Sequence, residues 1–220
     1  MMIENLFKIF GTKTKALEIL YLLEDVKPVV RQGFYHNEIR KITDFCKEKG
    51  LYIEFSPYKI VLMDHGAYSN KGIKVDADDP REGMVFAYIS KGKEKAKKAN
   101  FHEANNNHIN LGKALGYPEC CCRFFKKHEP ERSRLDSDYT VCTAENSGGS
   151  EFPFYTNILK RSMDITLLNH FPCSFNCENS IKLAKNHLDI IKKHDPEMAD
   201  YFSERLKGKF NIEERLFEFI

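Results

Sequence analysis

The sequence predicts an α+β fold, with a small N-terminal α+β portion over residues 1–90 and a mainly helical, cysteine-rich portion over residues 91–220. Two observations indicate this division. Residues suited to strands thin out after residue 90, whereas apolar residues at helical spacing continue toward the C-terminus. The chain has 220 residues, which is enough for one good-sized domain or two small ones.

Two helices are predicted in the N-terminal portion. Thr14 can cap the first, whose apolar residues recur at helical spacing until Pro28 ends it. The second spans residues 36–49, and Gly50 stands where a left-handed C-terminal cap is expected. The apolar face of the second helix includes Cys46, which is therefore predicted to be a core residue.

Three strands are predicted in the same portion. Residues 51–55 alternate apolar and polar, residues 58–63 are rich in residues suited to a pleated surface, and Ser56-Pro57 forms a turn between them. Residues 84–89 form the third strand. The acidic residues 76–80 are predicted to form a turn, because they lack the glycine and glutamate of a calcium loop.

The C-terminal portion is predicted to contain six helices. They begin at residues 91, 118, 154, 172, 197 and 211. Pro118 and Pro172 each suit the first position of a helix. The polar residues 129–150 end in NSGGS and are predicted to form a flexible loop that contains Cys142.

Composition narrows the class of protein. The net charge of +2 is too small to indicate nucleic-acid or membrane binding by itself. The chain has no long apolar run and no signal-peptide pattern, so we predict a cytoplasmic protein without a membrane segment. In that reducing compartment the seven cysteines are better explained by metal binding or catalysis than by a disulfide framework.

Two cysteine segments share one pattern. YPECCC and HFPCSFNC each place a proline at or just before a predicted helix start and cysteines in the first turn. The unpaired backbone N–H groups and the positive end of the helix dipole stabilise thiolates there. If the two helix starts meet, they form one pocket with His170 at its rim. The predicted ligands are Cys120, Cys121 or Cys122, Cys173 and Cys177.

The spacing of these ligands bears on the metal. Cys173 and Cys177 are four residues apart, so on a helix they share one face. Cys120 and Cys121 diverge by about 100° on a helix, which is awkward for one tetrahedral zinc ion and favours an iron–sulfur cluster. Zinc is the alternative, with one cysteine of the triplet, His170, Cys173 and Cys177 as ligands. Burial as small core residues and a redox-active thiol pair are weaker interpretations.

Other residues extend the candidate site. Tyr155, Asn157 and Arg161 precede the second cysteine segment and could line a pocket beside it. A lysine run offers a surface for RNA or a phosphorylated ligand, although such a run on a helix is usually a solvated face. Its members are Lys91, Lys93, Lys95, Lys97 and Lys98.

The two cysteine segments also resemble an archaeal family, frequent in methanogens, that is known as a domain of unknown function. Its pattern is LGYPxCCxxFF followed by HxPCSxxCxxS, and the resemblance is best over residues 111–196. The matching residues are Leu115, Gly116, Tyr117, Pro118, Cys120, Cys121, Phe124, Phe125, His170, Pro172, Cys173, Ser174, Cys177 and Ser180. Cys122 departs from the paired pattern. The resemblance supports the site and implies no reaction.

Taken together, these features predict a metal-binding protein that holds an iron–sulfur cluster at two helix N-termini. A redox or sulfur-related role, for example in a modification pathway, would follow from such a cluster. The alternative is a structural zinc protein whose basic face binds RNA or a protein partner. The sequence leaves open whether the protein is an enzyme.

Overall fold

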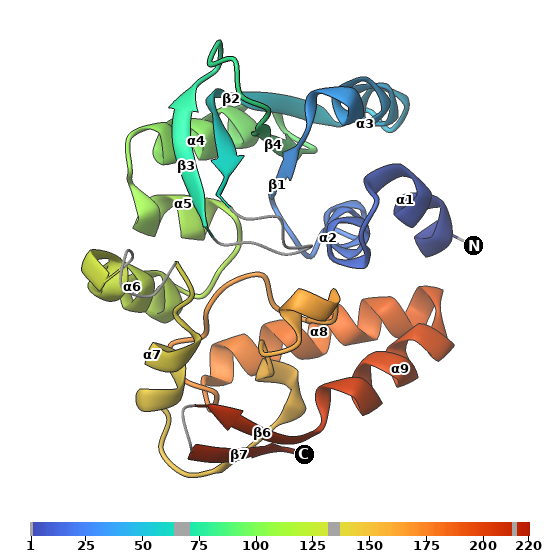
Figure 1. Cartoon of the computed structure of the whole chain (residues 1–220). Helices are drawn as coiled ribbons and strands as arrows, with labels where there is room; N and C mark the ends of the chain where they lie inside the picture. The colour runs from blue at the N-terminus through green and yellow to red at the C-terminus, as the bar shows by residue number, and fades with distance from the viewer. Residues whose placement is uncertain (1, 64–70, 132–136, 213–214) are drawn as a thin grey trace.

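The sheet of the N-terminal portion is antiparallel throughout. In the computed structural model, which describes residues 2–63, 71–131, 137–212 and 215–220, its strands are arranged in the order β1-β4-β2-β3 (Figure 1). These strands are β1 (Val30–Phe34), β2 (Tyr52–Leu62), β3 (Gly72–Asp76) and β4 (Met84–Ser90). The predicted α+β class is confirmed, because the rest of the chain is mainly helical with one small sheet.

Strand β2 corrects the prediction of two strands separated by a turn. The chain runs through Ser56-Pro57 without reversing, and its pairing with β4 shifts register between Phe55 and Lys59. The Ser56 hydroxyl donates to the Tyr58 carbonyl oxygen at 2.6 Å and accepts from the Phe86 amide at 3.0 Å. A side chain thus replaces hydrogen bonds that the ladder loses at this irregularity, and the serine-proline pair is accommodated within one strand.

The described residues of the N-terminal portion form three helices: α1 (Met2–Phe10), α2 (Lys13–Leu23) and α3 (His36–Glu48). The sequence prediction missed α1, which buries Ile3, Leu6 and Phe10. Helix α2 is capped by Thr12 and not by Thr14, since the Thr12 hydroxyl accepts from the Lys15 amide at 3.2 Å. The Thr14 amide and hydroxyl instead donate to the distant Asp164 carboxylate, at 2.9 and 2.6 Å.

Within its described residues, the C-terminal portion contains six α-helices and a three-stranded sheet in the order β5-β7-β6. The helices are α4 (Lys93–Ala104), α5 (His108–Ala114), α6 (Glu119–His128), α7 (Thr140–Glu145), α8 (Glu178–His194) and α9 (Pro196–Leu206). The strands are β5 (Glu151–Phe152), β6 (Gly208–Ile212) and β7 (Arg215–Phe219). Short 3₁₀ turns occur at η1 (Glu129–Glu131), η2 (Phe154–Thr156) and η3 (Arg161–Met163).

Several predicted helices in this portion are wrong or displaced. The helix predicted from residue 91 is broken between α4 and α5, where Asn106 adopts a positive φ of 54°. Residues 154–168 form two 3₁₀ turns in place of a helix, and the predicted loop 129–150 contains α7. The predicted helix 211–220 is largely the β6–β7 hairpin, because Phe217 and Phe219 alternate with more exposed neighbours and pack against Phe152.

The two portions share buried surface. The largest cluster of buried apolar side chains includes Leu17 and Phe34 from the first portion, and Ala184 and Phe202 from the second. Figure 1 shows α2 lying between the four-stranded sheet and α8. Tyr21 of α2 stacks on His187 of α8, with ring centroids 3.9 Å apart. The division into separate domains at residue 90 therefore stays a prediction.

The stacked His187 leads to a pH prediction. Burial lowers the pKa of His187 to about 4, although its Nδ1 contacts the Leu167 carbonyl oxygen at 2.8 Å. The unfolded chain binds a proton near pH 6.5, whereas the folded protein keeps the ring neutral down to about pH 4. Stability therefore decreases as the pH falls through this interval. Between pH 8 and pH 5 we expect His187 to account for about 2 kcal/mol of lost stability.

Urea unfolding of the wild-type protein and of His187→Gln at both pH values measures this contribution. Losses common to both proteins, such as those from carboxylates, cancel in the comparison. The variant is expected to lose about 2 kcal/mol less than the wild type over the interval. Equal pH dependence in the two proteins would show that His187 titrates normally in the fold.

Candidate metal centre

Four cysteine side chains converge where the two cysteine segments meet. The sulfur atoms of Cys120, Cys121, Cys173 and Cys177 all lie within 4.8 Å of one another. The Sγ atom of Cys177 is 3.7 Å from that of Cys120 and 3.7 Å from that of Cys121, and the Cys120 and Cys121 sulfurs are 3.9 Å apart. All four residues are free cysteines. A group of this kind could hold a metal ion.

Two helix starts position these sulfurs, although not as the sequence pattern predicts. Pro118 is the N-cap of α6, so Cys120 and Cys121 lie in the first turn of that helix. Helix α8 begins at Glu178 and not at Pro172, which corrects the prediction that Cys173 and Cys177 share a helical face. Cys177 is the N-cap of α8, and the preceding turn is closed by a 3.0 Å hydrogen bond from its amide to the Ser174 carbonyl oxygen.

Polar groups surround the sulfur atoms and can donate to thiolates. The Cys173 amide donates to Cys121 Sγ at 3.3 Å, and Ser180 Oγ lies 3.2 Å from the same sulfur. The Asn179 side-chain amide contacts Cys120 Sγ at 3.7 Å. Asn179 was missed by the sequence prediction. Its position in the first turn of α8, two residues after a predicted ligand, is the signal that could have found it.

The sulfurs strongly affect one another's ionisation. A hydrogen bond from Cys121 lowers the pKa of Cys177 to about 4, with a further contribution from Ser180. The same contact raises the pKa of the Cys121 thiol well above its usual range, and burial together with the nearby Cys177 raises the pKa of Cys173 to about 12. Among Cys121, Cys173 and Cys177, the protein alone thus favours the thiolate only at Cys177. A cation is needed to hold several.

The remaining cysteines near the site point elsewhere. The Cys122 sulfur contacts the Tyr117 carbonyl oxygen at 3.7 Å and faces α5, where a Cβ on Gly112 would come within 2.5 Å of it. Cys142 is buried on α7 and belongs to a second group, with His128 and Glu131, whose potential ligand atoms lie within 4.8 Å of one another. The structure therefore places Cys120 and Cys121, and not Cys122, beside Cys173 and Cys177.

His170 lies behind the four cysteines and outside their group. Its Nε2 is 2.9 Å from Ser180 Oγ, which in turn contacts Cys121. Burial and the nearby cations Lys27 and Arg161 lower the pKa of His170 to about 3, so the ring is neutral. The imidazole can thus orient the serine that contacts a ligand, the usual role of a group one step removed from a metal.

Each of the three residues expected to line a pocket has a different contact partner. Asn157 is buried and its side-chain amide donates to the Leu206 carbonyl oxygen at 2.5 Å, which is a structural role. The Tyr155 ring stacks on Phe154 at 4.2 Å. The Arg161 guanidinium lies 4.2 Å from the centroid of the Phe171 ring. None of the three belongs to the four-cysteine group.

Charged residues around the site are largely paired. Glu119 contacts Lys113 at 3.1 Å and Arg123 at 2.6 Å on the exposed side of α6. In the lysine run, Lys91 forms an ion pair with Asp25 at 2.8 Å. The other four lysines of the run are exposed on α4.

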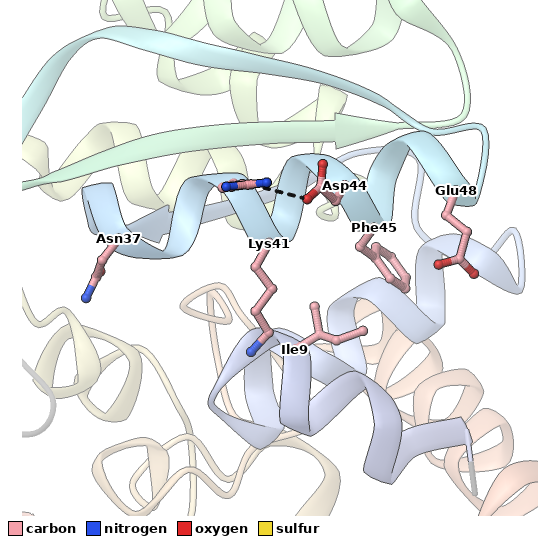
Figure 2. Close-up of a pocket in the computed structure, with 7 residues that line it drawn as sticks. Ile9, Asn37, Lys41, Asp44, Phe45 and Glu48 are labelled. Atoms are coloured by element: carbon pink, nitrogen blue, oxygen red, sulfur yellow. Dashed lines mark ion pairs between the residues drawn. The ribbon is translucent and has the colours of Figure 1, made fainter.

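Two hollows in the described part of the chain bear on the site. The larger, of about 480 Å³, lies between α3 and α1 and contains no cysteine; Figure 2 shows Lys41 reaching across it from α3 toward Ile9. The smaller, of about 290 Å³, adjoins the cysteines and has Cys121 and His170 in its wall. We call this second hollow the cysteine-side cavity.

Comparison with known protein families matches part of the chain. Residues 101–204 match a family model described as a protein of unknown function, DUF483. The matched region contains all four cysteines of the group. No curated protein and no solved structure matches the chain. In the described residues no helix is both long and apolar enough to cross a membrane.

Proposed function

We propose that the four cysteines bind a single Zn²⁺ ion and that this ion has a structural role. The observation that supports zinc most directly is the spacing of the sulfurs. A tetrahedral centre with zinc–sulfur bonds of about 2.3 Å places its sulfurs about 3.8 Å apart. The separations of 3.7, 3.7 and 3.9 Å among the Cys120, Cys121 and Cys177 sulfurs agree with that value, and the Cys173 sulfur lies within 4.8 Å of all three.

An iron–sulfur cluster, which the adjacent cysteines favoured at the level of sequence, requires a different spacing. Several irons and bridging sulfides would have to fit between the thiolates, so most ligand sulfurs would lie much farther apart. The first turn of α6 also removes the original objection to zinc, because it brings the neighbouring Cys120 and Cys121 sulfurs to 3.9 Å. The geometry therefore supports one metal ion over a cluster.

The number of ligands supports a structural role over a catalytic one. Catalytic zinc ions keep one coordination position open for water or substrate, whereas structural ions are closed by four protein ligands. The four thiols would supply all four ligands of such an ion and leave no open position. Such an ion would join α6 to the turn before α8, two segments more than fifty residues apart in the chain.

Metal analysis of the purified protein tests this proposal. We expect one zinc per chain, no labile sulfide and a colourless protein. Substitution with Co²⁺ should then produce the intense visible bands of tetrahedral thiolate coordination, which report ligand type and geometry independently of any activity. The His128→Ala variant, which disrupts the second group of potential ligands, should keep the zinc.

Three results would contradict the proposal. Iron together with labile sulfide would restore the cluster and its redox or sulfur-related role. A folded protein without any metal would remove the metal centre altogether and favour reactive thiols. One iron per chain without sulfide would keep the four-thiolate geometry but replace zinc as the ion.

Because a structural zinc ion has no open position for a substrate, the protein would bind its partners through other parts of its surface or through a pocket. The exposed lysines of α4 support the proposed contact with RNA or a protein partner, with Lys91 contributing less because Asp25 pairs with it. The free state of all seven cysteines supports a reducing, cytoplasmic location. The archaeal origin that the resemblance implies stays a prediction.

A further inference from the structure

The second group of potential metal ligands lies at the opposite end of α6 from the four cysteines. It consists of His128, Glu131 and Cys142, whose ligand atoms lie within 4.8 Å of one another. We call it the mixed-ligand group, because it combines an imidazole, a carboxylate and a thiol. His128 is the last residue of α6, whereas Cys120 and Cys121 lie in its first turn. About 10 Å of helix separates the two groups, so one ion could not use ligands from both.

Local structure brings the first two ligands together. Helix α6 continues directly into the 3₁₀ turn η1, which places His128 and Glu131 three residues apart on one helical path. Nδ1 of His128 lies 2.9 Å from a carboxylate oxygen of Glu131. A glutamate and a histidine at this spacing also supply two ligands to one metal centre in helical bundles. Cys142 adds the third ligand from a different element, α7.

The neighbouring carboxylate of Glu129 has other partners. It pairs with His108 of α5 at 2.9 Å and with Lys126 at 2.5 Å. Two carboxylates thus follow His128 within three residues, and the structure brings only Glu131 into the mixed-ligand group. The same chemical change made at each of the two glutamates can therefore distinguish a ligand from a nearby negative charge.

Exposure increases from the thiol to the carboxylate. Cys142 is 2% exposed, whereas the side chains of His128 and Glu131 are 18% and 38% exposed. Cys142 packs in an apolar cluster with Phe124 and Tyr139, and Tyr139 also lines the cysteine-side cavity. Apolar surroundings strengthen the attraction between a cation and a thiolate. The partly exposed carboxylate gives an ion an entry path from solvent.

The chemistry of the three ligands determines which ions fit. Bonds of about 2.0–2.3 Å to one tetrahedral ion place its ligand atoms about 3.3–3.8 Å apart. The three ligand atoms already lie within 4.8 Å of one another and need to move little. Thiolate and imidazole favour Zn²⁺ or Co²⁺ over Mg²⁺ and Ca²⁺, which take oxygen ligands. Three protein ligands leave one coordination position open.

We propose that the mixed-ligand group is a second metal site, which binds a divalent ion such as Zn²⁺ and keeps one coordination position open to water or to a small ligand. Three ligands with a single thiolate hold an ion less tightly than four thiolates do. The second site should therefore be empty after dialysis against a mild chelator, which leaves one zinc per chain in the four-cysteine centre. The two sites share no ligand, so either can exist without the other.

Titration of the dialysed, zinc-containing protein with Co²⁺ tests the second site. We expect one further cobalt ion per chain, with a thiolate-to-cobalt charge-transfer band and no competition from equimolar Mg²⁺. Cys142→Ala and Glu131→Gln should each weaken cobalt binding at least tenfold. The matched controls are Cys122→Ala and Glu129→Gln, which make the same changes outside the mixed-ligand group and should bind cobalt as the wild type does.

Uptake of no further cobalt, or of cobalt without the charge-transfer band, would overturn the second site. Equal weakening in Glu131→Gln and Glu129→Gln would also overturn it, because attraction to a negative surface would then explain the binding. If Cys142→Ala does not fold, Glu131→Gln alters a partly exposed side chain and carries the same test. Zinc retained through dialysis reports on the four-cysteine centre, and cobalt taken up afterwards reports on the mixed-ligand group. Failure of one site is thus distinguishable from failure of the other.

Discussion

If the four cysteines bind zinc as proposed, the Cys121→Ser variant is expected to lose the ion and most of its stability. Cys121 is the most connected of the four ligands, since its sulfur contacts Cys120, Cys177, Ser180 and the Cys173 amide. Structural zinc contributes about 10–16 kcal/mol of binding free energy in small zinc-dependent folds, which is comparable to the whole stability of an ordinary domain. We therefore expect a loss of several kcal/mol, measured by thermal unfolding together with zinc content.

The adjacent Cys122→Ser provides a matched control. It makes the same chemical change one residue along α6, but the Cys122 sulfur faces Gly112 and Tyr117 and not the four-cysteine group. This variant should keep one zinc per chain, as should Cys46→Ser in the core. Chelation of zinc from the wild type should reproduce the instability of Cys121→Ser and leave that variant itself unaffected. Similar zinc loss in all three variants would refute the ligand assignment.

Loss of the buried ion pair between Lys27 and Glu18 is expected to have the second largest effect. The Lys27 ammonium lies 2.8 Å from the Glu18 carboxylate, and both side chains are at least 95% buried. Burial lowers the pKa of Lys27, but the neighbouring Glu18 carboxylate more than offsets this effect. The pKa of Lys27 therefore lies above its ordinary value, and its ammonium group is charged. Lys27→Met leaves Glu18 charged and buried without its cation. Such a change costs about 3–5 kcal/mol, which urea unfolding can measure.

The double variant tests whether the pair explains that loss. In Lys27→Met/Glu18→Gln the remaining side chain is neutral and can still pair with Gln32, whose side-chain amide contacts Glu18 at 2.5 Å in the wild type. Most of the lost stability should return, because no buried charge is left unpaired. If the double variant is as unstable as the sum of the single changes, the two residues act independently. Lys27 would then matter mainly through its 3.2 Å bond to the Leu115 carbonyl oxygen.

Local sequence signals predicted those elements that depend on local interactions. The helix at 36–49 is marked by its apolar face and by Gly50, which adopts a φ of +64°. The signals failed where distant contacts decide the structure. The apolar residues 216, 217, 219 and 220 fit either a helix or a strand over so short a segment. The packing of Phe217 and Phe219 against Phe152 makes the segment a strand.

The sequence by itself determined the α+β class and the two proline-linked cysteine segments, because both follow from residue spacing along the chain. Only the tertiary structure decided which sulfurs meet. Whether Cys121 or Cys122 faces the second segment depends on the rotation of α6 against α5, where Gly112 makes room for the Cys122 sulfur. The distances between sulfurs, and with them the preference for a single ion over a cluster, likewise depend on packing between segments that the linear sequence keeps apart.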